Sequence, residues 1–156
     1  MSRDILLLKP YMRPLHEAHV QGCWDIGIRV ITTYTLRTPL EQVALYAQGR
    51  ELLSMVNLKR KAAGMAPITD KENARPVTHT MASNHLGTPP DGLACAYDLC
   101  IVDKNGCVWD TKVDADHDQI PDWKEVADVG VKLGLTAGYY WPSPNQDPAH
   151  FERRAA

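Results

Sequence analysis

The chain lacks the long apolar run that a membrane anchor or a secretion signal requires. Its N-terminal segment contains only four consecutive apolar residues, Ile5 to Leu8. A signal-peptide core needs roughly 7–15 such residues and a membrane-spanning helix about 20. We therefore expect synthesis in a cytoplasm without a signal peptide and no insertion into a membrane. Any action outside the cell would require a separate route of exit.

An excess of positive charge is also missing. Seventeen Lys and Arg residues stand against nineteen Asp and Glu residues, which gives a formal net charge of −2 over 156 residues. Nucleic-acid-binding domains carry a clear basic excess, so this composition argues against a nucleic-acid partner. The same balance gives no long-range attraction toward a polyanionic substrate.

Cysteine pairs with the spacing of a zinc site are absent. The chain has four cysteines and no C-x-x-C pair: Cys23, Cys95, Cys100 and Cys107. Three of them fall in a β-like stretch. Because buried free thiols behave as small apolar residues, we expect all four to be free and inert in a reducing compartment.

Internal repeats, low-complexity tracts and long linkers are absent too, so residues 1–156 form one predicted domain. A chain of this length can bury roughly two thirds of its unfolded surface. Helices are predicted over 9–22, opening at Pro14, and from Thr38, where Glu41 completes a capping box. This second helix either ends at Gly49 or continues toward 64, and 64–76 is predicted to be a loop.

Strand patterns alternate with these helices. Residues 26–34, 94–102 and 107–109 read as strands, and an Asn-Gly turn joins the last two. A third helix is predicted from a second capping box, Asp122 with Glu125, to a glycine at 134, and 135–141 is strand-like. This order predicts an α+β fold with a small antiparallel sheet and flanking helices.

Two histidines and an aspartate, His85, Asp98 and His150, have the chemistry of a catalytic zinc site. Two imidazoles and one carboxylate leave a fourth tetrahedral position on zinc for water. Asp147, three positions before His150, can then move a proton of that water. Arg37 can neutralise the oxyanion that forms on the attacked carbonyl. Since both histidines must be neutral to bind zinc, affinity should fall below a pH of about 6.5.

Three ordered motifs carry a family resemblance. The first is a turn and helix, Leu36-Arg37-Thr38 followed by Gln42-Val43-Ala44-Leu45-Tyr46-Ala47-Gln48-Gly49-Arg50. The second comprises Ser83, His85, Ala96 and Asp98, and the third comprises Asp147, His150, Phe151 and Glu152. From residue 28 to 152, the chain resembles the zinc D-Ala-D-Ala carboxypeptidases and dipeptidases and the related phage L-alanyl-D-glutamate endopeptidases.

The resemblance implies a single domain of the Hedgehog/DD-peptidase type. It makes His85, Asp98 and His150 the zinc ligands, Asp147 the general base and Arg37 the stabiliser of the transition state. Ser83 and Glu152 would orient ligands. For Glu152 a surface ion pair is an open alternative, and for Ser83 a local turn hydrogen bond.

The implied activity is that of a phage or prophage endolysin. Its substrate would be the stem peptide of bacterial peptidoglycan, cut at L-Ala-D-Glu by a monomeric enzyme. The enzymatic alternative is a D-Ala-D-Ala carboxypeptidase or dipeptidase. An alternative of another class is a zinc-binding module of the same fold without catalytic activity.

One spacing departs from the family pattern. Twelve residues separate His85 from Asp98, where the family has six, and the excess lies in 88–93. If this insert forms a surface loop, Asp98 is the ligand. If it folds into the site, Asp91 competes for that place. We favour Asp98 because it lies in a β-like segment, whereas Asp91 lies in a Pro-Pro-Asp-Gly turn.

A second cation site is predicted at residues 114–125. Acidic residues occupy positions 1, 3, 5, 9 and 12 of this segment, the spacing of a calcium loop: Asp114, Asp116, Asp118, Asp122 and Glu125. Gln119 replaces the glycine that such loops have at position 6. The alternative is an acidic, solvated loop that caps the third helix through Asp122.

Overall fold

The computed structural model describes residues 2–154 and confirms the predicted α+β class. In chain order, the elements are η1 (Ile5–Leu7), α1 (Met12–Asp25), β1 (Val30–Tyr34), α2 (Pro39–Ala47), α3 (Leu53–Ala62), η2 (Glu72–Ala74), β2 (Ala96–Asp103), β3 (Gly106–Val108), α4 (Asp122–Lys132), β4 (Thr136–Ala137), η3 (Gly138–Tyr140) and β5 (His150–Glu152). Among these residues, no helix is long and apolar enough to cross a membrane.

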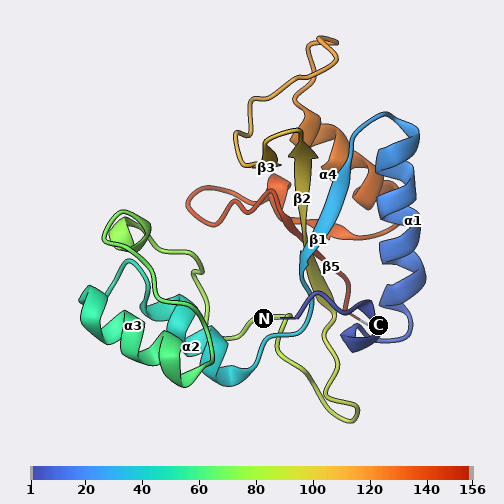
Figure 1. Ribbon diagram of the computed structural model, residues 1–156. Helices are drawn as coiled ribbons and strands as arrows, with labels where there is room; N and C mark the ends of the chain where they lie inside the picture. Colours follow the sequence, from blue (N-terminus) through green and yellow to red (C-terminus); the bar gives the residue numbers. More distant parts are fainter. Residues whose placement is uncertain (1, 155–156) are drawn as a thin grey trace.

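The strands form one antiparallel sheet with β2 at its centre (Figure 1). The order is β1-β2-β5-β4, and β3 also pairs with β2. Side chains of β2 alternate between the two faces of the sheet. Tyr97, Leu99 and Ile101 enter the hydrophobic core, so Asp98 points to the opposite face.

Helices α1 and α4 cover the core face of the sheet, and Figure 1 shows them beside each other. Trp123, Val126 and Ala127 of α4 are buried, on the face that their helical spacing predicts. Gly130 allows the close approach, because an added Cβ would lie 3.0 Å from the ring of Phe151 on β5.

Helices α2 and α3 form a pair that is set apart from the sheet in Figure 1. The predicted capping box is confirmed: Glu41 N donates to Thr38 Oγ1 at 3.2 Å, and Thr38 N donates to Glu41 Oε2 at 2.8 Å. The helix ends at Ala47, two residues before Gly49, which confirms the shorter of the two predicted helices, and a separate helix begins at Leu53. Gly49, with φ +77°, turns the chain between them.

Some predicted boundaries are wrong. Helix α1 begins two residues before Pro14, since a proline is tolerated anywhere in the first turn. It also runs three residues past 22. The strand predicted over 26–34 starts only at Val30, because Gly27 adopts a left-handed φ of +89° after the helix. Of 135–141, only 136–137 is strand.

The second predicted capping box is also wrong. Helix α4 begins at Asp122 itself, and within the described chain the preceding Pro121 makes no side-chain cap. The carboxylate of Asp122 instead accepts a hydrogen bond from the backbone N–H of Ala115 at 3.0 Å. Asp122 therefore closes the 114–125 loop rather than capping the helix.

The expectation of four free thiols is wrong for one pair. Cys100 and Cys107 form a disulfide between β2 and β3, with their Cα atoms 5.8 Å apart. The hairpin that the Asn-Gly turn creates brings these residues together, which a spacing of seven in sequence did not reveal. Cys23 and Cys95 are free and buried, as predicted.

Candidate metal centre

His85 lies on the loop before β2 and is fixed by its backbone and by its ring. Its carbonyl accepts from Arg37 N at 2.9 Å, and its N–H donates to Ser83 Oγ at 3.3 Å. The ring Nδ1 lies 2.7 Å from the carbonyl oxygen of Thr35. A carbonyl oxygen can only accept, so Nδ1 carries the proton and the Nε2 lone pair faces inward.

Asp98 and His150 are brought together by strand pairing. They lie directly opposite each other on β2 and β5. The outer nitrogen of His150, Nε2, lies 2.8 Å from Glu152 Oε2, and Asn84 Nδ2 donates to the same oxygen at 2.6 Å. Because the carboxylate of Glu152 accepts, the proton of a neutral His150 sits on Nε2 and its Nδ1 lone pair faces Asp98.

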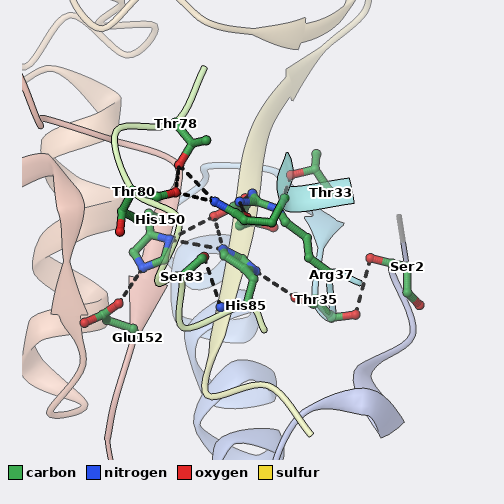
Figure 2. A network of polar contacts seen from close by, with 12 residues as sticks. Ser2, Thr33, Thr35, Arg37, Thr78, Thr80, Ser83, His85, His150 and Glu152 are labelled. Atoms are coloured by element: carbon green, nitrogen blue, oxygen red, sulfur yellow. Dashed lines mark hydrogen bonds and ion pairs between the residues drawn. The ribbon is translucent and has the colours of Figure 1, made fainter. Parts of the chain in front are cut away.

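Three donor atoms converge as a result. His85 Nε2, His150 Nδ1 and Asp98 Oδ1 lie 3.0, 3.1 and 3.2 Å apart in pairs, and Figure 2 shows the two imidazoles facing each other. All three residues are buried. Three inward-facing lone pairs repel one another unless a proton or a cation lies between them. This group can therefore hold a metal ion.

Arg37 binds the second oxygen of the aspartate. Its Nη2 donates to Asp98 Oδ2 at 3.0 Å and its Nη1 to Gln42 Oε1 at 3.3 Å. Burial alone would raise the pKa of Asp98, but the charge of His85 and hydrogen bonds with both histidines hold it well below its usual range. The carboxylate is therefore ionised and held in place. Contact between Arg37 and an oxyanion stays a prediction.

The two residues expected to orient ligands differ in what they touch. Glu152 contacts the His150 ring directly, whereas Ser83 forms a local turn with the backbone of His85, which is the alternative left open for it. Asn84 was not assigned to the site from the sequence, and its place between Ser83 and His85 of the second motif was the available signal. Gln42, in the helix of the first motif, positions Arg37 through its side-chain amide oxygen. Thr35 acts through its carbonyl oxygen, for which a side-chain pattern gives no signal.

A cleft of about 770 Å³ opens beside this group, and Asp147 lies on its wall. Its loop is tied to η3 by a hydrogen bond from Asp147 N to Gly138 O at 3.0 Å. Within residues 2–154, the carboxylate of Asp147 has no recorded hydrogen bond or ion pair. Burial, together with the charge of Asp98, raises its pKa. A carboxylate with a raised pKa is a better proton acceptor than an ordinary one.

The insert at 88–93 is a surface excursion, as the Asp98 alternative requires. Thr88 and Leu93 close it by pairing with each other. Asp91 is engaged outside the cluster: its Oδ1 accepts from Lys9 Nζ at 2.7 Å and from Leu93 N at 3.0 Å. The structure therefore places Asp98, and not Asp91, beside the two histidines.

The acidic residues of 114–125 gather at the start of α4 but are largely engaged with their own loop. Asp114, for example, accepts from the backbone N–H of both Asp118 and Gln119. Gln119 has a φ of +76°, the left-handed conformation for which calcium loops use glycine. Burial and the charges of the neighbouring aspartates raise the pKa of Glu125. Exposed acids gather in many loops without an ion, so calcium binding stays a prediction.

Metal binding is expected to release a proton at neutral pH. Burial alone would lower the pKa of His150, but its hydrogen bonds with Asp98 and Glu152 and the charges of Asp98 and Asp147 raise it from 6.5 to about 9. Below that pH, a proton on the metal-free protein competes with the ion. Affinity should therefore rise with pH until about 9, beyond the 6.5 expected from the sequence, with about one proton released at pH 7.

Calorimetric titration with zinc in buffers of different ionisation enthalpy measures this proton. Equal heats in all buffers at pH 7, with zinc bound, would contradict a protonated His150.

The comparisons with known proteins give no assignment. The chain matches no family model, and no curated protein matches it. The family resemblance of the three motifs therefore stays a prediction.

Proposed function

We propose that the protein is a zinc-dependent peptidase that cuts the stem peptides of bacterial peptidoglycan. The observation that carries this proposal is the convergence of three lone pairs, from His85, Asp98 and His150, at the side of an open cleft. Asp147 lies on the same cleft with a raised pKa and no recorded side-chain partner among the described residues. A structural metal site needs neither an open cleft nor a proton acceptor.

The donor set favours zinc among divalent metals. Imidazole nitrogens suit zinc, and calcium and magnesium prefer oxygen ligands. Zinc bonds of about 2.0–2.1 Å in a tetrahedron place neighbouring donors roughly 3.3 Å apart. The observed separations of 3.0–3.2 Å are close to this value. With three protein donors, a fourth position is left for water or substrate.

The residues around the metal-binding group would then have separate roles. A zinc ion would supply Lewis-acid activation of the water and of the peptide carbonyl. A carboxylate oxygen of Asp147 accepts a proton from the attacking water and returns it to the leaving amine. Arg37 holds the carboxylate of Asp98 in place through a hydrogen bond to Oδ2, and Glu152 keeps the proton of His150 on the outer nitrogen. These contacts fix the geometry before the substrate arrives.

L-Ala-D-Glu is the preferred bond, because the helix motif from Gln42 to Arg50 is most similar to that of the endopeptidases that cut this bond. An endolysin role, with release through a separate pore, is part of the same proposal. Digestion of purified peptidoglycan sacculi, followed by mass analysis of the fragments, tests it. We expect new L-Ala carboxyl ends and D-Glu amino ends, lost with a chelator and restored by zinc.

Other products would point to the alternatives. Release of terminal D-Ala from the stem peptides would indicate a carboxypeptidase. Cleavage of free D-Ala-D-Ala alone would indicate a dipeptidase. A protein that keeps its zinc and releases nothing from any of these substrates would be a binding module, and the proposal would be wrong.

A further inference from the structure

The cleft beside the candidate metal centre has an aromatic wall. Trp109 and Trp141 both line it. The ring of Trp141 lies 5.0 Å from the ring of His150, so the aromatic surface begins at a metal-binding residue. Trp109 is 58% exposed. A large apolar side chain left uncovered in a cleft marks a binding surface.

Trp109 is held in place although it is exposed. Its ring stacks on that of Trp123, with the centroids 6.3 Å apart and the planes at 16°. Trp123 is buried in the core on α4. One face of the Trp109 indole is therefore supported by the core, and a ligand that covers the other face has little side-chain entropy to remove.

The sheet register places Trp109 near the metal-binding residues. One edge of β2 is occupied by β1, and the other carries β5 opposite Asp98 and β3 opposite Ile101. Trp109 directly follows β3, so it lies beside the part of β2 between Asp98 and Ile101. With about 3.3 Å per residue, this part of β2 is within roughly 10 Å of Asp98.

One cationic side chain of the cleft lies away from Trp109. Arg154 also lines the cleft, and it follows β5 beyond Glu152, which pairs with Ala96 at the start of β2. Trp109 lies toward the other end of the same strand. Along β2, Asp98 therefore lies between the end that carries Arg154 and the end near Trp109, and Trp141 lies beside His150.

We propose that Trp109 and Trp141 form a subsite for the pyranose ring of the muramyl sugar. This inference rests on the proposed function. When L-Ala-D-Glu is cut, only L-Ala and a lactyl group separate the bond from that ring, which places the ring within about 10 Å of the bond. The C–H face of a pyranose packs on the electron-rich face of an indole. In D-Ala-D-Ala the sugar is several residues away and could not reach this wall.

The test compares two substrates that differ only at the amino end. Both contain L-Ala-γ-D-Glu followed by a diamino acid, and one carries an N-acetyl group where the other carries a muramyl group. We expect Trp109→Ala to lower kcat/KM about tenfold for the muramyl substrate, through KM, and less than about twofold for the acetyl substrate. Trp109→Phe should recover part of the loss. Trp24→Ala, which removes an exposed indole outside the cleft lining, should leave both rates unchanged.

The possible outcomes distinguish a failure of the subsite from a failure of the proposed function. Equal loss on both substrates, or no loss on either, overturns the subsite while the proposed function stands. If thermal melting shows that Trp109→Ala is not folded, Trp109→Phe and Trp141→Ala give the same comparison. If the wild type cuts neither substrate, the proposed function fails, and calorimetry with muramyl-L-Ala decides the subsite: binding weakened by Trp109→Ala supports it, and no binding overturns it.

Discussion

Replacing Asp98 with alanine is expected to remove the metal from the protein, with zinc content falling from about one ion per chain to nearly none. Asp98 supplies the one anionic donor of the three, and its loss leaves two buried imidazoles without a counter-charge. His150→Ala should have the same effect. Elemental analysis after dialysis measures the zinc content of each variant.

Asp91→Ala is the matched control for this experiment, because Asp91 is the rival aspartate and pairs with Lys9 at the surface. It should keep full zinc content. Glu152→Gln should weaken zinc binding by about 10–100-fold without abolishing it, as the loss of an outer partner of a ligand does. Full zinc in Asp98→Ala together with loss in Asp91→Ala would show that the 88–93 insert enters the site.

Asp147→Asn is expected to keep zinc bound and to slow cleavage on the order of 10²–10⁴-fold. An amide has nearly the same shape as the carboxylate but cannot accept the proton of the attacking water. Because Asp147 has no recorded side-chain hydrogen bond or ion pair within residues 2–154, its replacement should leave the fold and the three donors unchanged. Steady-state rates on sacculi and zinc content are measured on the same preparation.

Asp70→Asn, at an exposed position outside the cleft lining, controls for the loss of one charge and should cleave at the wild-type rate. An Asp147→Asn protein with the wild-type rate would contradict the role of Asp147 as base. Glu152 would then be the next carboxylate to test.

Much of the site could be predicted because its metal-binding groups and its proton acceptor are side chains of recognisable type. The capping box at Thr38 and the turn at Asn105-Gly106 use local rules, and both were predicted correctly. His85 and Asp98 could be paired across the insert because Asp98 lies in a strand pattern, and a strand is a rigid place for a ligand.

The missed features depend on tertiary contacts. The carboxylate of Asp122 accepts a hydrogen bond from Ala115 N because the 114–125 loop folds back on itself. No local capping rule contains that contact. The outer partner of His85 is a backbone oxygen, which every residue has. Strand β5 is three residues long, too short for an alternating pattern to be recognised, although it carries His150 into place.

The central claim is that His85, Asp98 and His150 hold zinc. Zinc K-edge X-ray absorption of the protein loaded with one equivalent of zinc tests it most directly. Zinc held by these three residues would show nitrogen and oxygen ligands at about 2.0–2.1 Å, with the outer scattering of two imidazole rings and no sulfur. A sulfur shell at about 2.3 Å would assign the ion to cysteines. An oxygen-only shell without imidazole would assign it to the acidic loop at 114–125, and either result would contradict the account.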